Sequence, residues 1–285
     1  MPGKQAGWIG LGLIGLPMAA RLAAAGWRVK GFDISPERLE MARARSVEAV
    51  ASAEAAMEGA SLVFTSMPTE AALAGLSTRL AAGMPAQAIL VETTTAGPAA
   101  SAKLAEALAA RRIAYLRAPI SGSVGLAESG TLTTFVSGPK PAFDAARPAL
   151  AAYTRAQLWL GEAEEARYAK LAVNLMVAVT VGMLGEMLAL AQKGGIGWEA
   201  ALDLLGESVV ASPLVKYKLE PLKRRDYTPT ATGALMLKDL DLIVEAARQA
   251  GIALPLASEM RAAYQRMPKS QLTAEDFISI VKCGS

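Results

Sequence analysis

The stretch GWIGLGLIGLPMAARLAAAGWRVKGFD, residues 7–33, predicts a complete strand, helix and strand unit. Its opening apolar residues are typical of a buried strand, residues 13–26 have the apolar spacing of a helix, and residues 27–33 form a second apolar run. A strand, a helix and a second strand in this order are the repeating unit of parallel sheets. The stretch therefore predicts a doubly wound α/β domain in the first part of the chain.

The turn between this strand and helix is rich in glycine and has the spacing Gly-x-Gly-x-x-Gly. The first two glycines permit a tight turn and a close approach of the backbone to a pyrophosphate, and the third lets the helix pack on the strand. The N-terminus of the helix adds N–H donors and a positive dipole. Because an acidic residue ends the next strand, the motif favours cofactor binding over a purely structural turn. The predicted cofactor contacts in this unit are Gly10, Gly12, Leu13, Ile14, Gly15 and Asp33.

Asp33 also indicates which nicotinamide dinucleotide binds. A carboxylate can accept hydrogen bonds from ribose hydroxyls but repels a 2′-phosphate, so NAD is preferred and NADP remains possible. Arg28 and Lys30 lie in the same predicted strand and could weaken that preference.

Strands continue to alternate with helices until Gly161, and only helices are predicted after it. A long helix from about Glu164 to Lys193 follows. The fold class is therefore α/β, with an N-terminal Rossmann doubly wound sheet over residues 1–162 and an all-α C-terminal domain over residues 163–285. The further strands are predicted within residues 61–68, 88–93, 114–120, 131–138 and 156–161, and the later helices within 198–207, 233–251, 255–267 and 274–282.

Composition excludes several classes of protein. The chain has 285 residues, is 53% hydrophobic, and carries a formal charge of +3 without a dense block of Lys or Arg, so we expect a globular protein with no nucleic-acid partner. A single cysteine and the absence of a signal-peptide pattern make the cytoplasm the expected location. The apolar stretch 168–191 is the only membrane candidate, but Asn174, Thr180 and Glu186 interrupt it, which favours a buried interior helix.

The chain contains no histidine. This excludes zinc sites built on histidine, serine–histidine triads and dehydrogenases that use histidine as acid or base, and we predict no metal site. None of the six tyrosines is followed four residues later by lysine, which excludes the Tyr-x-x-x-Lys pair of short-chain dehydrogenases. Hydride transfer from an alcohol still needs a base, so lysine becomes the leading candidate.

Lys170 is the lysine most enclosed by apolar sequence, and Asn174 follows one helical turn later. Burial would lower the pKa of the Lys170 amine toward the range of a general base, and Asn174 could hold a substrate hydroxyl beside it. The alternative is a lysine whose stem is buried while its amine reaches solvent, with an asparagine that makes a local contact. The spacing alone leaves both interpretations open.

Five motifs, in order, resemble those of the β-hydroxyacid dehydrogenase family, which includes 3-hydroxyisobutyrate dehydrogenases and tartronate semialdehyde reductases. The resemblance covers nearly the whole chain, and the substrate loop and the lysine motif are its specific parts. The motifs are GWIGLGLIGLPMA at 7–19, ETTTAGP at 92–98, APISGSVGLAESGTLT at 118–133, KLAVN at 170–174 and KDLDL at 238–242.

The resemblance implies a hydride transfer between a nicotinamide cofactor and a small 3-hydroxy acid or its semialdehyde or keto form. It implies that Lys170 is the general acid/base and that Asn174 helps to fix the substrate in an active site between the two domains. It also implies that the helical domain pairs, as a homodimer or homotetramer. The substrate carboxylate would be held by Ser121, Gly122 and Ser123, and the cofactor lined by Met67, Pro68, Thr95 and Lys238. Asp239 and Asp241 are expected to be solvated charges on a helix.

The sequence departs from the family pattern at three positions. Arg117 stands where the family often has an acidic residue, Ser123 replaces a glycine and Thr94 replaces a serine. Arg117 could reach a second anionic group of a larger substrate, but we favour a surface salt bridge.

Two other functions remain open at this stage. An imine reductase has the same architecture, although those enzymes usually place Asp or Tyr at the position of Lys170. A non-catalytic cofactor-binding module is the second alternative, and the presence of both Lys170 and Asn174 argues against it. A full 6-phosphogluconate dehydrogenase is disfavoured because its longer helical portion and histidine-containing motif are missing.

Overall fold

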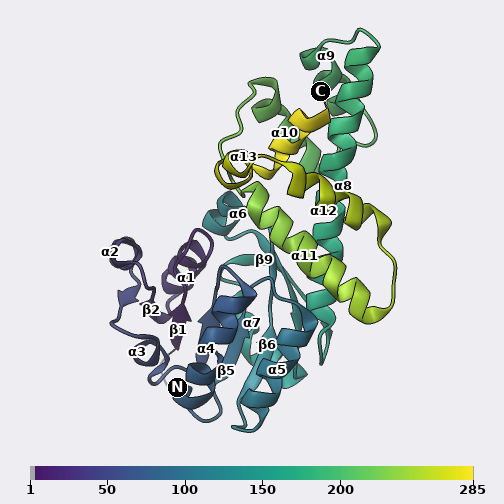
Figure 1. Ribbon diagram of the computed structural model, residues 1–285. Coiled ribbons are helices and arrows are strands. Elements are labelled where there is room, and N and C mark those ends of the chain that lie inside the picture. The colour runs from purple at the N-terminus through teal and green to yellow at the C-terminus, as the bar shows by residue number, and fades with distance from the viewer. Residues whose placement is uncertain (1–3, 285) are drawn as a thin grey trace. The chain divides into compact units, whose positions relative to one another are not determined.

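A computed structural model describes residues 4–284 of the chain, which divides into two compact units, Met1–Lys170 and Leu171–Ser285. The first unit is an α/β sheet and the second is helical, so the predicted fold class is confirmed (Figure 1). The strands are β1 (Gln5–Ile9), β2 (Arg28–Phe32), β3 (Glu48–Ala49), β4 (Leu62–Thr65), β5 (Ile89–Glu92), β6 (Ala114–Arg117), β7 (Ile120–Ser121), β8 (Leu132–Ser137) and β9 (Thr154–Gly161).

Helices connect these strands and then form the second unit. In the first unit they are α1 (Gly15–Ala24), α2 (Pro36–Arg43), α3 (Ala53–Met57), α4 (Glu70–Gly83), α5 (Pro98–Ala109), α6 (Val124–Ser129) and α7 (Lys140–Leu150). Helix α8 (Glu165–Lys193) begins in the first unit and continues into the second, where α9 (Trp198–Glu207), α10 (Pro213–Lys223), α11 (Gly233–Ala250), α12 (Pro255–Arg266), α13 (Lys269–Ala274) and the 3₁₀ helix Phe277–Gly284 follow.

The sheet brings the ends of its central strands to one edge. Its order is β3-β2-β1-β4-β5-β6-β8-β7, with β9 beside β8, and strands β1 to β6 are parallel. The last residues of neighbouring strands are in register, because Ile9 pairs with Thr65, Thr65 with Glu92, and Glu92 with Arg117. The loops after β1, β4, β5 and β6 therefore leave the sheet side by side, where ligands of doubly wound folds bind.

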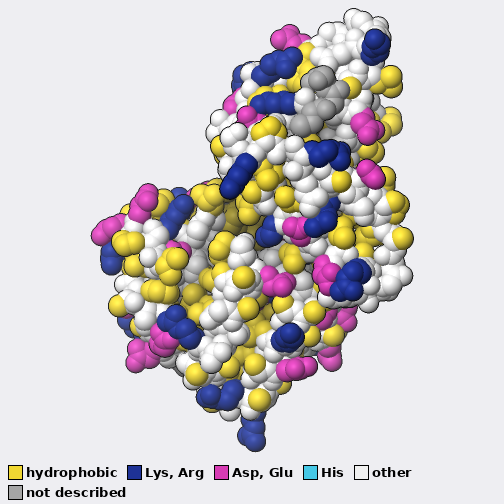
Figure 2. All heavy atoms as spheres, viewed as in Figure 1, with side chains coloured by type: hydrophobic (Ala, Val, Ile, Leu, Met, Phe, Trp, Pro, Cys, Tyr) yellow, Lys and Arg dark blue, Asp and Glu magenta, His cyan; other side chains and the backbone are white. Residues whose placement is uncertain are grey.

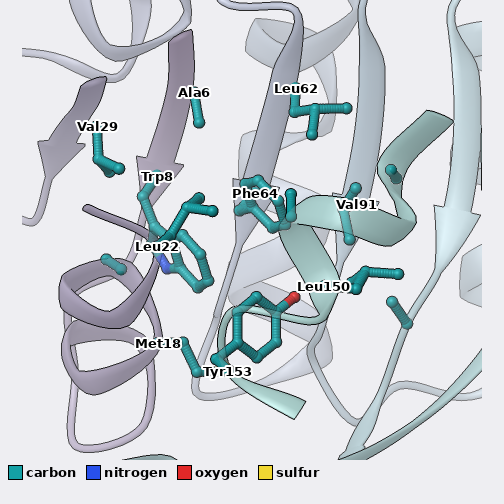
Figure 3. Close-up of a cluster of buried hydrophobic side chains, with 14 of the residues drawn as sticks. Ala6, Trp8, Met18, Leu22, Val29, Leu62, Phe64, Val91, Leu150 and Tyr153 are labelled. Carbon is teal, nitrogen blue, oxygen red and sulfur yellow. The ribbon is translucent and has the colours of Figure 1, made fainter. Parts of the chain in front are cut away.

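A stacked aromatic pair lies at the centre of one face of the sheet. Trp8 and Phe64 are fully buried, their ring centroids lie 4.6 Å apart, and Tyr153 meets Trp8 edge-on at 5.7 Å. Met18 and Leu22 of α1 pack against them, as Figure 3 shows. Offset-stacked and edge-on rings are the favourable geometries for aromatic side chains, so this cluster fixes α1 behind the glycine-rich turn.

The opposite face of the sheet is covered by α3, α4 and α5. Their buried side chains pack against Ile9, Val63 and Leu90, which point away from the Trp8 side because neighbouring residues of a strand alternate between faces. Both faces are thus apolar, as expected for central parallel strands. This packing holds the carboxyl ends of the strands in fixed positions.

The second unit has a core of its own to which α8 contributes Ala178, Val181, Leu184 and Leu188. By length and composition α8 is also apolar enough to cross a membrane, and 39% of its most apolar window is buried within the chain. We expected a buried interior helix, and the structure instead gives it one buried stripe and one exposed apolar stripe. The exposed stripe contains Met176, Met183 and Leu190.

Two helices of the second unit differ from the sequence prediction. Helix α10 was missing from it, because charged residues and Pro221 interrupt its apolar periodicity. Helix α13 was also missing, because the predicted helix over 274–282 shares only Ala274 with it. Helix α13 ends at Ala274 and a 3₁₀ helix begins at Phe277. The interruption lies at Asp276, which is buried and accepts hydrogen bonds from Lys218 at 2.8 Å and from the Ile278 N–H at 3.1 Å.

Charged side chains of both signs are interspersed on the face of the molecule drawn in Figure 2. Exposed ion pairs among the described residues include Arg79 with Glu54 at 2.7 Å and Arg45 with Glu128 at 2.9 Å. Such exposed pairs contribute little to stability, about 0–1 kcal/mol each.

Candidate active site

The glycine-rich turn joins β1 to α1, and its three glycines serve different purposes. Gly10 has φ +92°, and a Cβ there would lie 2.3 Å from the carbonyl oxygen of Ser66. A Cβ at Gly15 would lie 2.1 Å from the carbonyl oxygen of Gly10. Both positions therefore need glycine for the packing of the chain itself.

Gly12 differs, because a Cβ there would meet no described atom within 4 Å. It lies at the entrance to α1, whose N-terminus has no side-chain cap. Open space beside uncapped N–H groups is what a pyrophosphate needs, so the residues present fit a dinucleotide.

Asp33 holds the end of β2 against this turn. Its carboxylate accepts a hydrogen bond from the Leu11 N–H at 2.7 Å and another from the Ser35 N–H at 2.9 Å. Each carboxylate oxygen can accept more than one hydrogen bond, so both can still accept from a ribose hydroxyl.

The basic residues of β2 are engaged elsewhere. Arg28 lies at the amino end of the strand, remote from Asp33, and pairs with Glu48 at 3.0 Å. Lys30 pairs with Glu58 at 3.5 Å. Both cations are therefore paired with glutamates.

The loops after β4 and β5 are joined by hydrogen bonds. The Met67 N–H donates to the Thr94 hydroxyl at 2.9 Å, and the hydroxyls of Ser66 and Thr93 lie 2.8 Å apart. These bonds place Met67, Pro68 and Thr95 at the same edge of the sheet as Gly10. Pro68 is exposed, while Met67 and Thr95 are half-buried.

The predicted substrate loop is a short antiparallel strand followed by a helix, a structure that sequence periodicity did not predict. Ser121 is in β7 and pairs with Thr133 of β8. Gly122 has φ +143°, a conformation that favours glycine. Ser123 precedes α6, but its hydroxyl makes no capping hydrogen bond.

The start of α8 contains a buried arginine. Arg167 has no exposed surface and donates hydrogen bonds to the Glu92 carboxylate, to the Tyr115 hydroxyl at 2.8 Å, to the Ser101 hydroxyl at 3.2 Å and to the Thr94 carbonyl at 2.6 Å. Burial alone lowers the pKa of the guanidinium, but Glu92 and Tyr115 outweigh burial and raise it above its ordinary value. Arg167 is therefore a permanent cation inside the first unit.

Tyr115 connects Arg167 to a second ion pair. Burial raises the pKa of its hydroxyl to about 12, so it stays protonated at neutral pH. The Arg117 guanidinium lies over its ring, 4.5 Å from the centroid, and pairs with Glu164. Arg117 thus forms a salt bridge as predicted, but a buried one rather than a surface one. Sequence patterns gave no signal for Arg167, whose partners are remote along the chain.

Lys170 is half-buried on α8, one turn after Arg167, and is the last residue of the first unit. Asn174, one turn further, belongs to the second unit and is 8% exposed. Its side-chain amide donates to the Asp239 carboxylate at 2.7 Å, and the Lys238 amine lies 2.9 Å from the other Asp239 oxygen.

The prediction that Asp239 is a solvated charge is therefore wrong. It faces the packed side of α11, three residues after buried Met236, and that spacing was the available signal. Asp241 does pair at the surface, with Arg261 at 2.5 Å. Among the described residues, no group of three or more Asp, Glu and Cys side chains is arranged to hold a metal ion.

Two family models match the chain. One, described as the NAD binding domain of 6-phosphogluconate dehydrogenase, matches residues 5–161, more than half of the chain. The other, described as NAD-binding of NADP-dependent 3-hydroxyisobutyrate dehydrogenase, matches residues 165–283. The chain belongs to the β-hydroxyacid dehydrogenase family. It is an oxidoreductase that uses a nicotinamide dinucleotide.

Named relatives of this β-hydroxyacid dehydrogenase extend over almost the whole chain. An L-threonate dehydrogenase from Cupriavidus necator is 29% identical over 98% of this chain and 95% of its own length. An NAD-dependent L-serine dehydrogenase from Pseudomonas aeruginosa is 29% identical over 98% of this chain and 97% of its own. The structure of Mycobacterium tuberculosis 3-hydroxyisobutyrate dehydrogenase with L-serine has a TM-score of 0.90, with 26% identity and 99% of both chains covered.

Imine reductases are more distant. That of Streptomyces aurantiacus has a TM-score of 0.65 and 19% identity over 99% of both chains, a likeness of fold alone. The comparisons therefore favour the hydroxyacid dehydrogenases over the imine reductases.

The glycine geometry predicts opposite outcomes for two alanine variants. Gly12→Ala should leave the free energy of unfolding within about 1 kcal/mol of the parent value, because the new methyl meets no protein atom. It should weaken NAD binding by at least roughly tenfold, about 1.4 kcal/mol, because the methyl occupies the proposed pyrophosphate space. Calorimetric titration with NAD measures the affinity and urea unfolding measures the stability.

Gly15→Ala is the matched control. It should destabilise the apoprotein by about 1–3 kcal/mol, because its methyl collides with the Gly10 carbonyl. Unchanged NAD affinity in a folded Gly12→Ala protein would contradict the assignment of this turn to the pyrophosphate.

Proposed function

We propose that this enzyme oxidises a small 3-hydroxy acid to its semialdehyde or keto form with NAD, or runs the reverse reduction. The observation that carries the proposal is the position of Lys170. It is half-buried on α8, one turn after Arg167, which donates a hydrogen bond to the Thr94 carbonyl in the loop that also contains Thr95. Because the chain has no histidine, we assign the role of general acid/base to this lysine. The L-threonate and L-serine dehydrogenases act on hydroxy acids, as their names state.

In the proposed oxidation, the neutral Lys170 amine takes the substrate hydroxyl proton. A nicotinamide cofactor, when bound, would supply the hydride acceptor for the carbon that carries this hydroxyl. In the reduction, the Lys170 ammonium returns the proton to the forming alkoxide. Such a positioned base contributes typically about 100-fold to 10,000-fold to the rate.

Asn174 supports this role through its side-chain amide. Asp239 accepts from one N–H of this amide, which fixes the side chain and leaves the second N–H available to donate to the oxygen of the substrate hydroxyl. We assign Lys238, the other partner of Asp239, to the cofactor. Asp239 thus connects the side chain proposed to hold the substrate, Asn174, with the one proposed to contact the cofactor, Lys238.

Ser121, Gly122 and Ser123 are the proposed carboxylate clamp. The Ser123 hydroxyl makes no capping hydrogen bond to α6. Gly122, between the two serines, has a positive φ that favours glycine. Arg117 is already paired with Glu164 and adds no cation for a second acidic group. We therefore propose a substrate with a single carboxylate.

Replacement of Lys170 tests the function. Lys170→Ala should lower kcat by about 100-fold to 10,000-fold with short 3-hydroxy acids and NAD, because it removes the proposed base. NADH affinity, measured by fluorescence, should change by less than about threefold. Lys193→Ala, an exposed lysine at the end of the same helix, is the control and should keep parental activity.

The same assay distinguishes the alternatives. Turnover of a cyclic imine without hydroxy-acid turnover would identify an imine reductase. NAD binding without turnover of either substrate would identify a cofactor-binding module. Parental activity in Lys170→Ala would refute Lys170 as the base.

The proposed preference for NAD is supported by Asp33 and by the pairing of Arg28 and Lys30 with glutamates. Asp33→Asn keeps an acceptor for the Leu11 N–H but removes the charge. The ratio of kcat/KM for NADP to that for NAD should rise by roughly tenfold, the equivalent of one charge-assisted hydrogen bond of about 1.5 kcal/mol. An unchanged ratio in steady-state assays would contradict the role of Asp33 in cofactor choice.

We also propose a homo-oligomer, supported by the exposed apolar stripe Met176, Met183 and Leu190 on α8. Light scattering should give a mass of at least twice the 29.6 kDa chain. Met183→Glu should reduce that mass, because a charge would be buried in the interface. A monomeric parent protein would exclude the oligomer.

A further inference from the structure

We propose that Arg167 is a positioning residue, which sets the place of Lys170 relative to the loops that line the cofactor. The inference rests on the proposed role of Lys170 as the acid/base. Arg167 itself touches neither substrate nor cofactor, because it has no exposed surface. It acts through the helix that carries both side chains.

The first step is the attachment of α8 to the sheet. Arg167 lies three residues before Lys170, so both project from the same side of adjacent helical turns. Its guanidinium reaches the carboxylate of Glu92, the last residue of β5, and the hydroxyl of Tyr115 in β6. One side chain thus ties the turn before Lys170 to two central strands.

The second step leads from Arg167 to the cofactor loops. The Thr94 carbonyl accepts from Arg167 at 2.6 Å, the Thr94 N–H donates to Glu92 at 2.5 Å, and the Thr94 hydroxyl accepts from the Met67 N–H at 2.9 Å. Thr94 precedes Thr95, and both Met67 and Thr95 are proposed to line the cofactor. The same guanidinium therefore holds the acid/base helix and the cofactor loops in one hydrogen-bonded network.

The third step is a second attachment of the same helix start. Glu164 pairs with Arg117, whose guanidinium lies over the ring of Tyr115. Arg167 binds Glu92 of β5, and Glu164, three residues before Arg167, binds Arg117 of the neighbouring strand β6. Two attachments that share Tyr115 fix the rotation of the helix start about its axis as well as its distance from the sheet.

A structural role alone is a weaker explanation of this arrangement. Apolar side chains of the same volume often stabilise a protein as well as a buried ion pair does, or better. What the ion pair adds is a defined geometry, because Arg167 donates to four separate acceptors. Defined geometry matters here because a shift of about 1 Å in a reacting group can cost about 100-fold in rate.

The test separates stability from positioning with a double variant. Arg167→Met combined with Glu92→Gln leaves neither buried charge of this pair without its partner, and the new amide can still accept from the Thr94 N–H. Arg167→Met alone leaves Glu92 unpaired and should lower the thermal midpoint, which the double variant should largely recover. In both variants kcat for the 3-hydroxy acid should fall by at least about tenfold.

Three measurements identify the cause of the lower kcat. The dissociation constant of NADH and the KM of the hydroxy acid should stay within about threefold of the parent, because the glycine turn and the carboxylate clamp are intact. The deuterium isotope effect on kcat, with substrate labelled at the carbinol carbon, should rise, because the chemical step becomes slower. Arg167→Lys, which can reach Glu92 but lacks the planar fork, should recover only part of kcat.

The chain provides a matched control in the second unit. Lys218 and Asp276 form another buried ion pair. Lys218→Met with Asp276→Asn should lower stability in a similar way and leave kcat within about threefold of the parent. If the Arg167 double variant does not fold, Tyr115→Phe removes one acceptor of Arg167, keeps the ring under Arg117, and should lower kcat by about threefold to tenfold.

The outcomes distinguish this inference from the proposed function. No 3-hydroxyacid turnover by the parent, or parental turnover by Lys170→Ala, would refute the proposed function and the inference with it. Lys170-dependent turnover with parental kcat in every folded Arg167, Glu92 or Tyr115 variant would overturn the inference alone. An increased dissociation constant for NADH with parental kcat would also overturn it, since Arg167 would then serve the cofactor loop and not Lys170.

Discussion

The buried pair of Arg167 and Glu92 is the constraint on which the arrangement of the first unit depends. Burial of a guanidinium and a carboxylate costs free energy, and here four acceptors around Arg167 offset that cost. Glu92 ends a central strand in register with Thr65 and Arg117, at the edge where the glycine-rich turn also lies. The interaction that fastens α8 to the sheet is therefore also bonded to the loops of the proposed cofactor site.

Local patterns were sufficient to predict the longer strands, the bounds of α8 and the glycine turn, because each depends on residues close in the sequence. The two-residue strands β3 and β7 were not predicted as separate strands. The buried ion pairs could not be predicted in this way, since 75 residues separate Arg167 from Glu92 and 47 separate Glu164 from Arg117. Asp239 was misjudged for a related reason: neighbouring charges in a sequence resemble a solvated face, and its contact with Asn174 spans 65 residues. Helix α10 was missed because Pro221 and its charges hide its periodicity.

In a chain without histidine, the acid/base group must be a side chain whose surroundings in the fold adjust its pKa. Free lysine has a pKa of about 10.4, so a lysine base works near neutral pH only if its surroundings disfavour the ammonium. Lys170, the proposed base, is half-buried on α8. Asn174, the second side chain of the motif, is neutral and its orientation is fixed by Asp239, so its remaining amide N–H is the donor proposed for the oxygen of the substrate hydroxyl.

Arg117 is a departure from the family pattern whose charge is paired within the protein. Alone, an arginine in place of an acid suggests a different substrate, because it reverses the charge beside the substrate loop. In the folded chain Glu164 pairs with it and Tyr115 packs beneath it, so the local charge is balanced within the protein. A residue whose charge is already paired contributes little to the difference in affinity between substrates with one and with two acidic groups. Arg117 therefore contributes to the attachment of α8 to the sheet. The departure at Ser123 differs, because its hydroxyl makes no capping hydrogen bond and it belongs to the proposed carboxylate clamp.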